Sequence, residues 1–175
     1  MTDLASNSEA KFHFDTREVE PMSEHKVPET KPIVPDFAVI ECRIEISLAA
    51  NKAWEKIGIY GDAGKYLNVE SQQIAGEGGI GSIRTISGSI VEVMVGKGPL
   101  SYTYTQTTGP MADFQYHGNV ALDATGENTS KLTYTINYDQ TKMDQPARAA
   151  AAEKIRPRFQ GMVEAMKADA EASAS

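Results

Sequence analysis

The feature of this sequence that most constrains its fold is a long series of strand-like segments followed by a single helical one. Six segments are strand-like in composition, at about 68–75, 80–87, 89–96, 99–108, 113–124 and 129–140. Short turns rich in glycine and proline separate them, and a spacing of about ten residues is typical of strands joined by hairpins. Consecutive strands joined in this way pair antiparallel, so the pattern predicts one meandering sheet.

A further strand and two short helices precede this series. In residues 37–48 apolar and polar side chains alternate, which predicts a strand with one buried and one solvated face. Residues 49–57 then follow helical spacing up to Gly58, and a second helical turn is expected between Gly61 and Gly64. The first strand is therefore separated by helices from the rest of the sheet.

The C-terminal segment predicts one long amphipathic helix, from about Gln145 to Ala168. Asp144 is a suitable N-cap, and Pro146 fits the first turn. Pro157 lies inside the helix, where proline removes a backbone hydrogen bond, so a bend is expected near residues 153–156. A single apolar stripe runs along the helix and consists of Ile155, Phe159, Met162, Val163 and Met166.

These elements together predict an α+β helix-grip fold. A seven-stranded curved antiparallel sheet surrounds the long C-terminal helix, and two short helices follow the first strand. A closed barrel could fill its own interior, but an amphipathic helix needs an apolar surface against its stripe. Because the concave face of the sheet and the helix cannot touch everywhere, we expect a cavity between them.

The chain is expected to divide into three parts. Residues 1–35 contain four prolines and many acids but no sustained period, which predicts a disordered arm. Residues 36–170 form the helix-grip ligand-binding domain, and residues 171–175 are expected to fray.

Charge and composition exclude several classes of partner. The net charge is −7 and Lys and Arg do not cluster, which argues against nucleic acid and against an anionic membrane surface. No apolar run approaches the roughly 18 residues of a membrane helix, so no membrane insertion is expected. The polar N-terminus lacks the apolar core of a signal peptide, and Cys42 is the only cysteine, which together predict a cytoplasmic protein. The oligomeric state is expected to be a monomer or a homodimer.

Several short motifs, in this order, resemble the START/Bet v 1-like (SRPBCC) superfamily, and within it the polyketide cyclase/dehydrase-like branch. The likeness covers about residues 37–168. It rests on Ala53-Trp54, GEGGIGSIRTI (76–86), Ser87-Gly88, Val91-Glu92, LSYTYTQTTGPM (100–111) and Tyr116. The superfamily spans hormone receptors, lipid carriers, allergens and cyclases, so the resemblance implies the fold and an apolar ligand cavity more than one function. Two departures are Tyr134, where relatives often have tryptophan, and residues 87–90, which differ from the SGLPA gate of the plant abscisic-acid receptors.

Strand parity and the resemblance select the candidate ligand-binding residues. Parity places Arg84 beside Ser82 and Ile86, and the resemblance implies that Arg84 and Glu92 point inward. The segment 89–95 is apolar on both faces, so its register is uncertain by one residue, and a solvated cross-strand pair is the alternative for Arg84 and Glu92. Tyrosines suit an aromatic ligand but also form structural cross-strand pairs. The candidates are Trp54, Arg84, Glu92, Tyr102, Tyr104, Tyr116, Tyr134, Phe159, Met162 and Met166.

The familiar catalytic arrangements are missing from the predicted domain. His117 is its only histidine and parity turns it outward, which excludes Ser-His-Asp and Cys-His schemes and a histidine-based metal site. The run Gly76–Gly81 lacks the Lys-Ser/Thr ending of a phosphate loop and is interpreted as a turn. We therefore expect no metal and no cofactor.

Three functions stay open at this point. The first is a binder or carrier of a hydrophobic, aromatic or polycyclic small molecule. The second is a polyketide cyclase/dehydratase-like enzyme, in which Glu92 performs acid–base chemistry while Arg84 or a tyrosine polarises a carbonyl group. A weaker third is a protein-binding module that uses the N-terminal arm.

Overall fold

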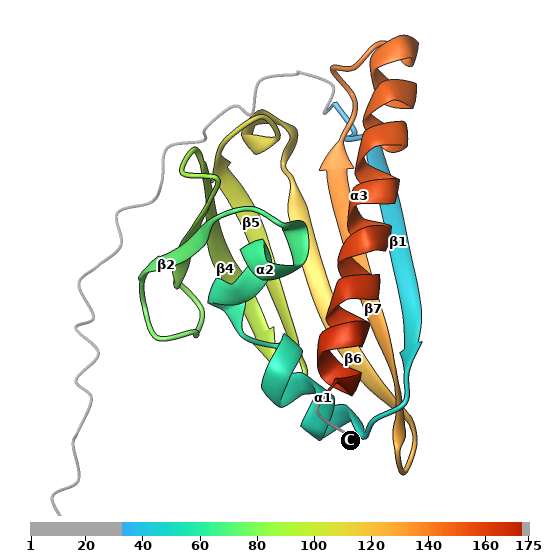
Figure 1. The fold of residues 1–175 in the computed structure, drawn as a ribbon. Coiled ribbons are helices and arrows are strands. Elements are labelled where there is room, and N and C mark those ends of the chain that lie inside the picture. Colours follow the sequence, from blue (N-terminus) through green and yellow to red (C-terminus); the bar gives the residue numbers. More distant parts are fainter. Residues whose placement is uncertain (1–32, 173–175) are drawn as a thin grey trace, which may run out of the picture. The chain divides into compact units, whose positions relative to one another are not determined.

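The computed structural model describes residues 33–172, and residues 34–172 form an α+β helix-grip domain, as predicted (Figure 1). In chain order its elements are β1 (Phe37–Ile46), α1 (Ala50–Ile57), η1 (Tyr60–Asp62), α2 (Ala63–Leu67), β2 (Ser71–Ala75), β3 (Ile83–Ile86), β4 (Ile90–Gly98), β5 (Ser101–Thr108), η2 (Ala112–Phe114), β6 (His117–Gly126), β7 (Thr129–Asp139) and α3 (Gln145–Glu171). Of the predicted arm, only residues 33–35 are among the described residues, and residues 173–175 of the predicted tail also lie outside them.

The seven strands form one antiparallel sheet in the order β1-β7-β6-β5-β4-β3-β2. Strands β2 to β7 each pair with their sequence neighbours, while β1 joins the far side of β7, with Phe37 opposite Asp139. The predicted strand at 113–124 begins later, at His117, because η2 occupies residues 112–114 and Gln115 has a left-handed backbone with φ of 49°. The sheet is therefore open, and β1 and β2 are its edges.

The long helix α3 begins as the sequence indicates and extends further than expected. The Oδ1 atom of Asp144 accepts a hydrogen bond of 2.8 Å from the backbone N–H of Ala147. The helix continues through Pro157, which is exposed, without interruption. It ends at Glu171 instead of Ala168, since the Glu171 carboxylate accepts from the Ser47 backbone N–H at 2.7 Å.

Helix α3 packs on the side of the sheet formed by β1 and β7 (Figure 1). On this side Phe159 lies 4.9 Å from the Tyr134 ring, between centroids, and Lys167 donates to the backbone carbonyl of Glu45. The short helix α2 holds the C-terminal part of α3, where the Asp169 carboxylate pairs with Lys65. The helix thus covers one half of the sheet closely and leaves space over the half that contains β3 to β6.

None of the helices within residues 33–172 is long and apolar enough to cross a membrane.

Candidate functional site

A partly enclosed cavity of about 130 Å³ lies between α3 and the part of the sheet formed by β3 to β5. Its inner wall is buried, whereas Pro110 and Arg158 at its outer end are exposed. Most of the wall is apolar or aromatic. The residues that line it are Leu67, Arg84, Ile86, Ile90, Glu92, Tyr104, Gln106, Pro110, Met111, Tyr116, Ile155, Arg158 and Phe159.

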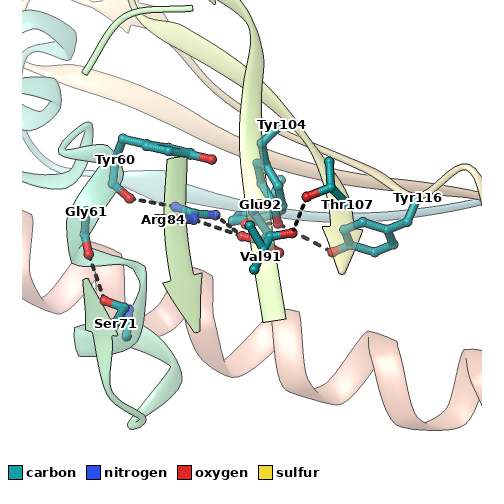
Figure 2. A network of polar contacts seen from close by, with 11 residues as sticks. Tyr60, Gly61, Ser71, Arg84, Val91, Glu92, Tyr104, Thr107 and Tyr116 are labelled. Atoms are coloured by element: carbon teal, nitrogen blue, oxygen red, sulfur yellow. Dashed lines mark hydrogen bonds and ion pairs between the residues drawn. The ribbon is translucent and has the colours of Figure 1, made fainter. Parts of the chain in front are cut away.

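A buried ion pair between Arg84 and Glu92 forms the polar part of the inner wall (Figure 2). Arg84 on β3 is the direct cross-strand partner of Glu92 on β4, and the left-handed residues Ser87 and Gly88 form the turn between these strands. The Nε and Nη2 atoms of Arg84 each lie 2.8 Å from Oε2 of Glu92, and Nη1 donates to the Tyr60 carbonyl at 2.7 Å. Arg84 is 1% exposed and Glu92 6%. Both side chains point inward, and the pair is not solvated.

Two tyrosine rings enclose the Arg84 guanidinium. Its Cζ atom lies 4.2 Å from the centroid of the Tyr60 ring and 4.5 Å from that of Tyr104, which is cation–π distance. Tyr104 can occupy this position because residue 118 on the neighbouring strand is glycine. A Cβ atom on Gly118 would lie 2.3 Å from Cζ of Tyr104. The guanidinium is therefore held by charge, by a carbonyl group and by two aromatic faces.

The tyrosine hydroxyls form a chain beside this pair. The Tyr104 hydroxyl lies 2.7 Å from that of Tyr134 and 3.4 Å from that of Tyr116. Burial raises the pKa of all three phenols above the ordinary range, so each remains neutral and can donate one hydrogen bond. Tyr104 and Tyr116 reach the cavity wall, which places neutral donors close to Glu92.

The electrostatic surroundings of Glu92 combine burial with several compensating groups. Burial raises the pKa of its carboxyl, and this outweighs the opposing effects of Arg84, of a hydrogen bond from Gln106 and of the more distant Arg158. Both contacts from Arg84 go to Oε2. Glu92 thus binds a proton more readily than an exposed glutamate and lines a cavity, which is the property expected of an acid–base group.

Half of the candidates from the sequence line the cavity, namely Arg84, Glu92, Tyr104, Tyr116 and Phe159. The other half, Trp54, Tyr102, Tyr134, Met162 and Met166, do not reach its wall. Trp54 packs on Tyr102, with ring centroids 5.8 Å apart. Tyr102 also packs edge-to-face with Tyr60, with ring centroids 5.5 Å apart. Side chains therefore fill the space next to α1 and η1. Met162 and Met166 are buried further along α3.

Several wall residues were not among the candidates. Gln106 shares strand parity with Tyr102 and Tyr104, so parity could have identified it. Pro110 and Met111 lie in a loop, where no period indicates which side chains face inward. Arg158 is exposed on α3 next to Phe159. A charged residue beside an apolar stripe does not by itself indicate that it lines a cavity.

The family described as polyketide cyclase / dehydrase and lipid transport matches residues 38–171. The chain belongs to this family. The resemblance to the polyketide cyclase branch of the Bet v 1-like proteins is thereby confirmed. Among functionally curated proteins, none matches the sequence significantly. Membership in this family supports hydrophobic-ligand binding or a cyclase-like role and does not choose between them.

Solved structures with the same fold come from proteins of different activities. The Zhui aromatase/cyclase from a Streptomyces species has a TM-score of 0.66 at 11% identity, over 80% of this chain and 97% of that one. A norcoclaurine synthase point mutant from Thalictrum flavum, in complex with a transition-state analogue, has a TM-score of 0.62 at 16% identity. This match covers 82% of this chain and 100% of that one. The protein Ara h 8.0201 has a TM-score of 0.63 at 18% identity, over 79% of this chain and 100% of that one. At these identities the likeness shows the fold alone.

Proposed function

We propose that the domain binds a small aromatic molecule inside the cavity and acts as a binder or carrier. The observation that carries this proposal is a partly enclosed, mostly apolar cavity whose inner polar groups already satisfy one another. Such a wall provides affinity for an apolar body, while a few polar groups fix its orientation. Here these groups are Glu92 and the hydroxyl of Tyr116, because Arg84 is engaged by Glu92 and Tyr60.

The size of the cavity limits the ligand. A dry apolar cavity of about 150 Å³ is known to hold benzene, so the 130 Å³ present here accommodates about one ring. A polycyclic ligand, the other possibility from the sequence, requires the outer end to widen. The exposed residues Pro110 and Arg158 lie at that end. We therefore expect monocyclic compounds to bind more tightly than fused polycyclic ones.

The matched blocking variant is Ile90→Trp, because Ile90 lines the cavity and is only partly buried. Its control is Val95→Trp, on the same strand but 44% exposed and outside the cavity wall. Thermal-shift and calorimetric titration of the full chain with one-, two- and three-ring aromatics should show one-ring binding in wild type and Val95→Trp, and loss in Ile90→Trp. Absence of binding across the panel, together with no co-purifying ligand in native mass spectrometry, would refute the proposal.

An enzymatic role of the same cavity is the second candidate. It is favoured by the Glu92 carboxyl, which lines the cavity with a raised pKa, beside the neutral hydroxyls of Tyr104 and Tyr116. In a cyclase or dehydratase reaction, Glu92 would remove a proton from carbon next to a carbonyl group, and a tyrosine hydroxyl would donate to the carbonyl oxygen. With a substrate in hand, Glu92→Gln should abolish turnover while retaining binding. Unchanged turnover would exclude this mechanism.

A further inference from the structure

The charges on the cavity wall do not cancel. Three charged side chains line it, namely Arg84, Glu92 and Arg158. Arg84 and Glu92 neutralise each other at 2.8 Å, so the guanidinium expected from the sequence to read an anionic ligand is already occupied. Arg158 is left as a net positive charge at the outer end, on a chain whose overall net charge is −7.

Arg158 differs from the other arginines of the described domain. Arg43 pairs with Glu41, Arg148 with Asp36, and Arg84 with Glu92, while Arg156 donates to the Glu41 carbonyl; those four are all engaged. Within residues 33–172, Arg158 makes no ion pair and no hydrogen bond. A guanidinium carries five donors in a planar fork that fits a carboxylate, so Arg158 retains its full capacity to bind one.

The position of Arg158 directs this capacity toward the cavity. It precedes Phe159 on α3 and follows Ile155 by one turn, and both of these residues also line the wall. Its charge acts on the interior, since it lowers the pKa of Glu92 and of Tyr116 relative to what burial alone would give. Because Arg158 remains exposed, an anion bound there keeps part of its hydration, and its desolvation penalty is small.

We propose that the natural ligand is a small aromatic carboxylate, with its ring inside the cavity and its carboxylate on Arg158 at the outer end. This inference rests on the proposed function and adds the charge and orientation of the ligand. The ring lies against Phe159, Ile86 and Tyr116, and the carboxylate accepts two parallel hydrogen bonds from the guanidinium. The acid therefore binds more tightly than an uncharged analogue of the same shape.

The test compares 3-phenylpropionate with 3-phenylpropionamide by calorimetric titration of the full chain. Wild type is expected to prefer the acid by about two- to fivefold, as for an exposed ion pair, and the preference should shrink with added salt. Arg158→Gln should lower the affinity for the acid to that for the amide, and Arg158→Lys should restore part of the preference. Arg156→Gln is the matched control on the same helix, outside the cavity wall, and should behave as wild type.

The outcomes separate this inference from the proposed function. Equal binding of acid and amide by wild type overturns the carboxylate inference and leaves the aromatic-binding proposal standing. A preference for the acid that persists in Arg158→Gln also overturns it, because the anion is then held elsewhere. Failure of both compounds and of every other one-ring aromatic contradicts the proposed function itself.

Discussion

Removing either member of the Arg84–Glu92 pair should destabilise the domain, but in different ways. Glu92→Leu leaves Arg84, which is 1% exposed, with the Tyr60 carbonyl as its one hydrogen-bond acceptor among residues 33–172. Arginine cannot lose its proton in a protein, so the charge stays buried and uncompensated. Breaking a buried pair in this way costs about 3–5 kcal/mol, and we expect this loss at every pH between 5 and 8.

Arg84→Met instead leaves the buried Glu92 carboxyl group without its partner, and a carboxyl group can be neutralised by taking up a proton. The pKa of Glu92 is already raised by burial and rises further once Arg84 is gone. An acid whose folded-state pKa is raised loses stability as the pH increases from about 4.3 through that pKa. At pH 8 Arg84→Met should therefore cost about 3–5 kcal/mol. At pH 5 the cost should fall to about 1–2 kcal/mol, mostly the lost cation–π contacts.

The double variant Arg84→Met/Glu92→Leu should be more stable than either single variant at pH 8, because no buried charge remains. Urea unfolding can be followed by the fluorescence of Trp54, which is the only tryptophan of the chain and packs against Tyr102. Additive losses in the double variant would refute the reasoning. Losses below about 1 kcal/mol in both single variants would also do so, since that is the value of a solvated pair.

Two further substitutions test the packing around the cavity. Gly118→Ala places a methyl group within 2.3 Å of Tyr104 Cζ and should break the hydrogen bond of Tyr104 to Tyr134, at a cost of about 1–3 kcal/mol in urea unfolding. Gly161→Ala in α3 is its control: a Cβ there meets nothing within 4 Å, so it should stabilise by about 0.5–1 kcal/mol. Phe159→Ala should cost about 3 kcal/mol, the low end for a buried aromatic ring because Phe159 faces the cavity, and should admit two-ring ligands in the titration. A larger loss without any gain in two-ring binding would contradict that position.

Periodicity was sufficient for the fold, whereas the inward position of Arg84 and Glu92 was expected from the family resemblance. The alternation along β3 and β4 turns Arg84 and Glu92 to the same face, although β4 carries register irregularities at Val91/Glu92 and Met94/Gly96 that alternation alone does not reveal. The extent of the cavity was not predictable in this way. A period of two tells which face a side chain takes, but not where along the sheet the helix stops touching it. Tyr102 therefore faces inward like Tyr104 but is covered by Trp54 and Tyr60.

The placement of β1 beside β7 has a consequence for how the chain reaches its native state. Among the strands of residues 33–172, β1 pairs only with the last one made, with Ile46 opposite Ser130. Bringing such distant segments together costs a large loop-closure entropy before their contacts give any stability. This cost slows folding. During synthesis, β1 is the first of the strands to emerge, and its backbone groups stay unpaired until β7 has left the ribosome. A nascent chain that stalls before residue 129 therefore exposes a free strand edge, the kind of surface that chaperones bind and that aggregates form on.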